Sequence, residues 1–124
     1  MKLEVGMYIR INGFISKIGH INTSKKGNTY IQFKQPNGLL ITMNTKFLDD
    51  EKASHNIIDL IEVGDYVNGE KVTSTMIKMR DEQGVFGLPN YYGTFVEEIP
   101  IKSIVTKEQF EAIKYEIKWN METN

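Results

Sequence analysis

The chain of 124 residues has no cysteine, three prolines and one tryptophan, and its apolar stretches are short. Without cysteine it has no disulfide framework and no thiolate metal site, which is typical of proteins in the reducing cytosol. No apolar run approaches the ~20 residues that span a bilayer, and the start, Met1-Lys2-Leu3-Glu4, lacks the pattern of a signal peptide. We therefore expect a cytoplasmic protein that has no membrane partner.

One sequence pattern occurs twice. Residues Glu4–Ile9 read EVGMYI, residues Glu62–Val67 read EVGDYV, and an Asn-Gly pair follows each copy. Asn-Gly between alternating runs is the strongest short-range signal of a β-hairpin, because both central residues of a type I′ turn need a positive φ. The repeat predicts duplicated hairpins in two halves, 1–48 and 56–119, joined by a polar loop over 44–55.

Most of the remaining chain has the composition of strands. In the run 29–34 the alternation places Ile31 and Phe33 on one face, with Tyr30, Gln32 and Lys34 on the other. Gly19 interrupts the strand expected over 14–22 and predicts a bulge or a barrel corner there. A run rich in β-branched residues, 71–80, is expected to form another strand, which the turn 81–84 ends.

One helix is predicted near the C-terminus. Thr106 and Gln109 have the spacing of a capping box, which indicates a short helix over 106–112, and an alternating strand is expected over 113–119. The fold class is therefore all-β and mainly antiparallel: an SH3-like or related small β-barrel. We expect a single domain over 1–124, because two separate halves of roughly 60 residues would each bury too little surface.

The charges divide unevenly along the chain. Residues 1–48 carry seven basic side chains and one acid, a net charge of +6, whereas residues 49–124 carry eight basic side chains and fifteen acids, a net charge of −7. Halves of opposite sign attract each other or offer a basic face to an acidic partner, and an uneven but simply solvated surface is the alternative.

Two segments and the start of the chain resemble a known group of sequences. The segments are Asn56–Gly69, which reads NIIDLIEVGDYVNG, and Ile101–Glu111, which reads IKSIVTKEQFE; the start is Val5–Arg10. They resemble small phage and prophage proteins of Firmicutes, a family to which no chemistry is assigned. The resemblance implies a bacterial host cytoplasm and a size class that includes inhibitors of bacterial defence, such as anti-CRISPR proteins. It carries over no catalytic or binding residues.

The sequence offers little for catalysis. His20 and His55 are the two imidazole groups, and neither stands in the signature context of a catalytic triad. The acids Asp49, Asp50 and Glu51 lack the spacing of a calcium loop, and no glycine-rich loop precedes a helix. We therefore expect a protein that is not an enzyme and has no catalytic residue, no metal site and no cofactor.

Two sets of residues are candidates for binding. Adjacent tyrosines offer large, stiff contact area, and nearby acids have the charge to mimic phosphates, so the predicted partner-binding set is Tyr91, Tyr92, Asp81, Glu82, Glu97 and Glu98. Basic groups beside aromatic rings suit single-stranded nucleic acid, so the alternative set is Arg10, Lys17, Lys25, Lys26, Tyr30 and Lys34. Against the alternative, the isoelectric point of about 6.1 is lower than is usual for such modules.

Three functions follow from these observations. The first is a phage or prophage accessory protein that binds and inhibits a host protein, for example a defence nuclease. The second is a module that binds nucleic acid or a nucleotide ligand through the basic N-terminal half. The third is a structural or assembly component. Unpaired strand edges invite pairing, so a homodimer is also expected as a possible state.

Overall fold

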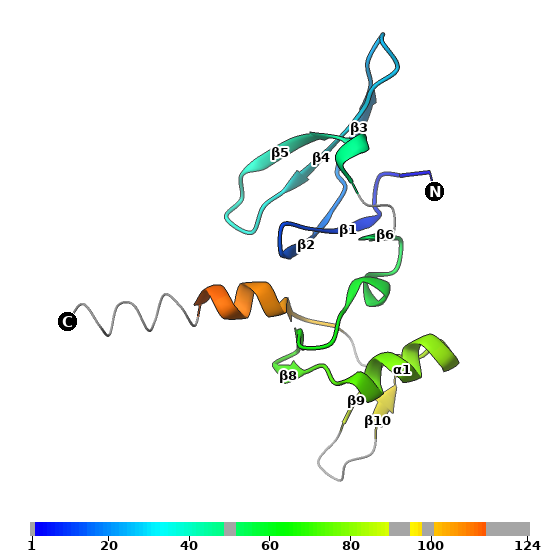
Figure 1. Cartoon of the computed structure of the whole chain (residues 1–124), viewed down its shortest axis with the longest axis vertical. Coiled ribbons are helices and arrows are strands. Elements are labelled where there is room, and N and C mark those ends of the chain that lie inside the picture. The colour runs from blue at the N-terminus through cyan, green and yellow to red at the C-terminus, as the bar shows by residue number, and fades with distance from the viewer. Residues whose placement is uncertain (1, 49–51, 90–94, 98–100, 114–124) are drawn as a thin grey trace, which may run out of the picture. The chain divides into compact units, whose positions relative to one another are not determined.

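The computed structural model describes residues 2–48, 52–89, 95–97 and 101–113. The chain divides into two compact units, Met1–Leu60 and Ile61–Asn124 (Figure 1). The first is built mostly from small antiparallel sheets, and the second combines short antiparallel strands with two helical segments. The prediction of a β-rich, mainly antiparallel protein is confirmed. None of the described sheets closes on itself, so the small barrel and the single domain stay predictions.

The first unit contains two three-stranded sheets. One has the order β2-β1-β6 and the other β3-β4-β5. The chain passes from the first sheet to the second between two adjacent residues: Ile18 N donates to Met7 O at 2.8 Å, and Gly19 N donates to Gln32 O at 2.9 Å. The corner that the sequence predicts at Gly19 is therefore present. The strands are β1 Tyr8–Ile11, β2 Phe14–Lys17, β3 His20–Thr23, β4 Thr29–Lys34, β5 Leu40–Asn44 and β6 Ala53–Ser54.

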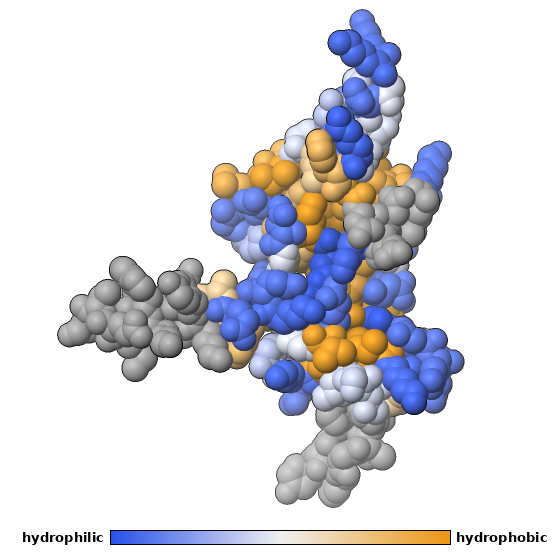
Figure 2. Space-filling view, viewed as in Figure 1, coloured by the Kyte–Doolittle hydropathy of each residue, from blue (hydrophilic) through white to orange (hydrophobic). Residues whose placement is uncertain are grey.

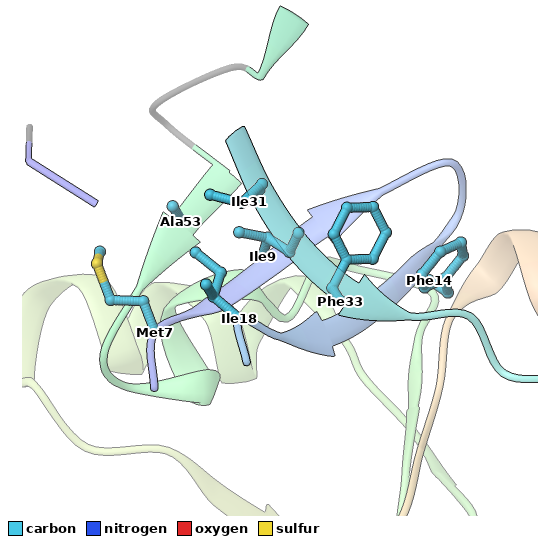
Figure 3. Close-up of a cluster of buried hydrophobic side chains, with 7 residues drawn as sticks. All are labelled: Met7, Ile9, Phe14, Ile18, Ile31, Phe33 and Ala53. Carbon is cyan, nitrogen blue, oxygen red and sulfur yellow. The ribbon is translucent and has the colours of Figure 1, made fainter. Parts of the chain in front are cut away.

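Apolar side chains from both sheets form the core of this unit (Figure 3). On β4 the predicted alternation is confirmed, because Ile31 is 0% exposed and Phe33 is 2% exposed while their neighbours face outward. The rings of Phe14 and Phe33 lie 6.2 Å apart. Each large apolar side chain buried in this way contributes about 1.5–3 kcal/mol. The buried cluster is Met7, Ile9, Phe14, Ile18, Ile31, Phe33 and Ala53.

The segment 44–55 is more than a polar loop. It contains a 3-10 turn, η1 Thr45–Phe47, and the strand β6, which pairs with β1. Ala53 opposes Ile9 and is buried, so this part of the segment completes a sheet of the first unit. A second 3-10 turn, η3 Ile57–Leu60, ends the unit.

The second unit has a smaller sheet. Its order is β11-β7-β8, and a separate pair is formed by β9 and β10. Ile61, Val67, Val72 and Met76 are each at most 1% exposed and form its apolar interior. The strands are β7 Tyr66–Val67, β8 Glu70–Lys71, β9 Gly87–Pro89, β10 Phe95–Glu97 and β11 Ile104–Val105.

The prediction of a strand over 71–80 is wrong, because a helix, α1 Ser74–Gln83, occupies most of this run. Thr73 caps its start by accepting from Met76 N, and the Met76 thioether accepts from Thr73 N at 3.4 Å. Gly84, with a φ of 73°, ends it and donates to Arg80 O. The hydrogen bonds at the helix ends stabilise α1 by more than its β-branched residues destabilise it. The described part of the chain therefore contains two α-helical segments where one was expected.

The helix predicted near the C-terminus is present over residues 107–113. Gln109 N donates to Thr106 Oγ1 at 3.1 Å and Thr106 N donates to Gln109 Oε1 at 2.9 Å, so the capping box forms as its spacing indicates. Ile113, the first residue of the predicted final strand, belongs to this helix. The rest of that strand, 114–119, lies outside the described residues.

The repeated sequence folds the same way twice. Asn12 and Gly13 have φ values of 51° and 81°, and Asn68 and Gly69 have 51° and 83°, so both central residues of each turn are left-handed as a type I′ turn requires. Each turn is a two-residue hairpin loop. It joins β1 to β2 in the first copy and β7 to β8 in the second.

The backbone bonds that close each hairpin also match. Gly6 N donates to Ile18 O at 2.9 Å, and in the second copy Gly64 N donates to Val72 O at 3.0 Å. The same comparison aligns Lys17 with Lys71, since each opposes the tyrosine of its own copy. The second hairpin is shorter by two residue pairs. The duplicated hairpin is therefore confirmed as a structural repeat.

Candidate binding groove

The outward face of the sheet β3-β4-β5 carries polar side chains together with the exposed Leu40. Its centre is β4, whose side chains at Tyr30, Gln32 and Lys34 alternate with the core residues between them. In register with Gln32 stand His20 on β3 and Thr42 on β5. Because directly paired residues place their side chains on the same face, a row of hydrogen-bonding groups crosses all three strands.

This face is hollowed at two adjoining places. One hollow, of about 330 Å³, is lined by His20, Asn22, Tyr30, Gln32 and Thr42. The other, of about 360 Å³, is lined by Ser16, Lys17, Gly19, His20, Gln32, Phe33, Lys34 and Leu40. Both hollows are lined by His20 and Gln32, so they adjoin each other, and we call them together the sheet groove. Within it Gln32 Nε2 donates to Thr42 Oγ1 at 3.2 Å.

The charges around the sheet groove are positive. Lys17 and Lys34 line one end of it. Lys25 and Lys26 are exposed in the turn between β3 and β4, beyond the other end of β4, where the projecting hairpin tip is hydrophilic (Figures 1 and 2). No acidic residue is among the lining residues of the groove.

The acids of the described part of the first unit are Glu4 and Asp59, and both are engaged elsewhere. Glu4 Oε2 lies 3.1 Å from His55 Nε2, in a pair that is exposed on both sides. Asp59 Oδ2 accepts from Ser54 Oγ at 2.6 Å. Neither of these two carboxylates lines the sheet groove, so among the described residues of this unit the charged side chains that line the groove are basic, which favours an anionic ligand.

The structure brings together part of the predicted nucleic-acid-binding set. Tyr30, Lys17 and Lys34 line the sheet groove. Arg10 is placed in the interior: it is 5% exposed, and its guanidinium donates to Leu60 O at 3.1 Å. This side chain satisfies a backbone carbonyl of η3 and is not part of the groove.

Eight of the residues that line the groove were absent from the predicted binding sets: Ser16, Gly19, His20, Asn22, Gln32, Phe33, Leu40 and Thr42. The alternation of apolar and polar residues along each strand predicts on which face of the sheet a side chain lies, and this was the signal available for these residues. Knowing which strands are neighbours, and in what register, requires the pairing of β3, β4 and β5. Those pairings are contacts between residues distant in sequence, which single-strand patterns do not specify.

The residues of the predicted partner-binding set do not form one described site. Asp81 and Glu82 are exposed on the last turn of α1, where Asp81 Oδ1 accepts from Arg80 Nε at 3.1 Å. Glu97 contributes its backbone to β10. Tyr91, Tyr92 and Glu98 lie outside the described residues.

The two histidines lie in different surroundings. His20 lines the sheet groove without an acidic neighbour in that lining, and His55 pairs with Glu4 on the surface. Across residues 2–48, 52–89, 95–97 and 101–113, no three histidine or acidic side chains cluster as a metal site would need. Neither of the helices in these ranges has the length and apolarity needed to cross a bilayer.

Comparison of the chain with protein-family models, with curated proteins and with solved structures gave no match. The sheet groove is therefore interpreted from its own geometry.

Proposed function

We propose that this protein is a non-enzymatic accessory protein of a phage or prophage that acts by binding, and that the sheet groove is its binding surface. The observation that carries the proposal is the groove itself: its lining combines uncharged polar side chains with Phe33 and Leu40, Lys17 and Lys34 border one end, and none of the lining residues is acidic. Its partner presents negative charge. A host protein with an acidic surface, such as a defence nuclease, is the first candidate, and the resemblance to phage and prophage proteins supports that context.

The scaffold that we infer for this surface is an SH3-like barrel formed by the first unit. Its two sheets are connected where β2 is followed by β3, through the two residues Ile18 and Gly19. After η1 the chain returns as β6 to pair with β1. A direct passage of the chain from one antiparallel sheet to the next and a 3-10 turn before the last strand are both features of SH3-like folds. Such folds host many functions, so the groove and not the fold supports the proposed role.

Affinity purification from lysogenic or infected cells tests the proposal. The full chain should capture a partner in stoichiometric amount, and the double variant Lys17→Glu, Lys34→Glu should lose it. Lys71→Glu is the matched control, because it makes the same change at the corresponding position of the other hairpin copy. Absence of a stoichiometric partner, or equal capture by the double variant, would overturn the proposal.

Nucleic acid is the second candidate partner, and one observation favours it. Tyr30 places a half-buried aromatic ring in the sheet groove, and Lys17 and Lys34 line one end of the same groove. A ring together with cations provides both a stacking surface for a base and charge for the phosphates.

A further inference from the structure

Resting on the proposed function, we infer that the ligand of the sheet groove is single-stranded nucleic acid. The argument starts from the order of groups along β4. Lys34 stands at one end of the strand, Gln32 and Tyr30 follow toward the other end, and Lys25 and Lys26 lie in the turn beyond it. At a rise of about 3.3 Å per residue, Tyr30 and Lys34 are separated by roughly 13 Å along the strand. Cations therefore bracket a neutral centre over the length of a few nucleotides.

The neutral centre has the chemistry that recognises bases. The side chains of Asn22, Gln32, Thr42 and His20 offer both donors and acceptors beside the ring of Tyr30. Base edges likewise carry donors and acceptors, and every base has a face that stacks on an aromatic ring.

The same geometry favours an unpaired strand over a duplex. Stacking on Tyr30 requires a base whose face is free, which a base-paired duplex does not offer away from its ends. Lys17 supports the charge at one end, although its ammonium also lies 5.5 Å from the ring centre of Tyr8. This cation–π contact holds the ammonium beside Tyr8 on the neighbouring strand.

Fluorescence anisotropy with the full chain and fluorescein-labelled dT12 and rU12 tests the inference. Binding should weaken with salt, since about −0.7 in the logarithmic salt slope is expected for each phosphate contact on a single strand. The double variant Lys17→Glu, Lys34→Glu should lower the magnitude of this slope by about 1.4 and weaken binding. Lys71→Glu should retain the slope and the affinity of the parent.

Tyr30 separates stacking from simple charge attraction. Tyr30→Ala should weaken binding roughly 5- to 150-fold, which corresponds to the loss of one stacked base, without changing the salt slope. Tyr30→Phe should retain the affinity, because it keeps the ring. A duplex of the same length should bind more weakly than either single strand. Circular dichroism of each variant establishes that it is folded.

The outcomes separate this inference from the proposed function. If neither oligonucleotide binds at low salt, or if Tyr30→Ala binds as well as the parent, the nucleic-acid inference is wrong. If a captured protein nevertheless depends on Lys17 and Lys34, and persists after nuclease treatment, the partner is an acidic protein and the proposed function stands. If no captured partner and no oligonucleotide depends on these lysines, both are overturned.

Discussion

Asp65 ties two segments of the second unit together and offers the sharpest test of the repeat. The side chain is 0% exposed. Its Oδ2 accepts from Glu62 N at 2.7 Å and its Oδ1 accepts from Lys107 N at 2.9 Å, so it joins the turn before β7 to the first residue of the helix over 107–113. In the other copy the same position is Met7, whose thioether accepts from Glu4 N at 3.2 Å.

The cost of removing the Asp65 carboxylate follows from these bonds. A hydrogen bond to a charged group contributes about 1.5–3 kcal/mol, and a buried N–H left without its acceptor costs about 1–3 kcal/mol. Because part of the cost of desolvating the carboxylate is recovered when it is removed, we expect Asp65→Ala to lower the free energy of unfolding by about 3 kcal/mol. Asp65→Met imitates the first copy: it retains an acceptor for Glu62 N and loses the bond to Lys107 N. Its cost should be smaller, about 1.5 kcal/mol.

Urea unfolding followed by far-ultraviolet circular dichroism measures these costs. With a urea slope of about 1–3 kcal/mol per molar, the midpoint of Asp65→Ala should fall by at least about 1 M. Amide hydrogen exchange locates the effect: Lys107 N should lose protection in both variants, while Ile9 and Ile31 in the core of the first unit should retain theirs. If the free energy of unfolding of Asp65→Ala lies within about 0.5 kcal/mol of the parent value, and Lys107 N is still protected, the reasoning is refuted.

Two further predictions concern turns. Glycine accepts the left-handed backbone of either Asn-Gly turn, so Asn12→Gly should change the free energy of unfolding by less than about 0.5 kcal/mol. Asn68→Gly should lower this free energy by about 1–2 kcal/mol. The difference arises because Asn68 Oδ1 accepts from two backbone N–H groups of residues 102–103, at 2.7 and 3.1 Å. Urea midpoints of the matched pair test this, and equal midpoints would contradict it. Gly84→Ala should destabilise by about 1 kcal/mol, since the φ of 73° strains any Cβ although the space beside Gly84 is open. A calorimetric scan that shows no fall in the melting temperature would argue against Gly84 as the residue that ends α1.

Several local features could be predicted because their causes lie within a few residues. The Asn-Gly turns need residues that tolerate a positive φ, and the helix after Thr106 needs a capping pair three residues apart; both are readable as short patterns. Helix α1 was missed because its capping box uses Met76 at the position where Glu or Gln is the usual signal. Its β-branched residues then favoured the wrong element.

The sequence by itself determined where the chain turns, which side chains of β4 face the core, and that one hairpin is built twice. Only the tertiary structure decided that Arg10 is buried against Leu60 O while Lys17 and Lys34 border a groove. It also decided that His20 and Thr42 stand on either side of Gln32. The physical reason is range: backbone preferences act between near neighbours, whereas burial and strand pairing depend on residues that folding brings together from distant parts of the chain.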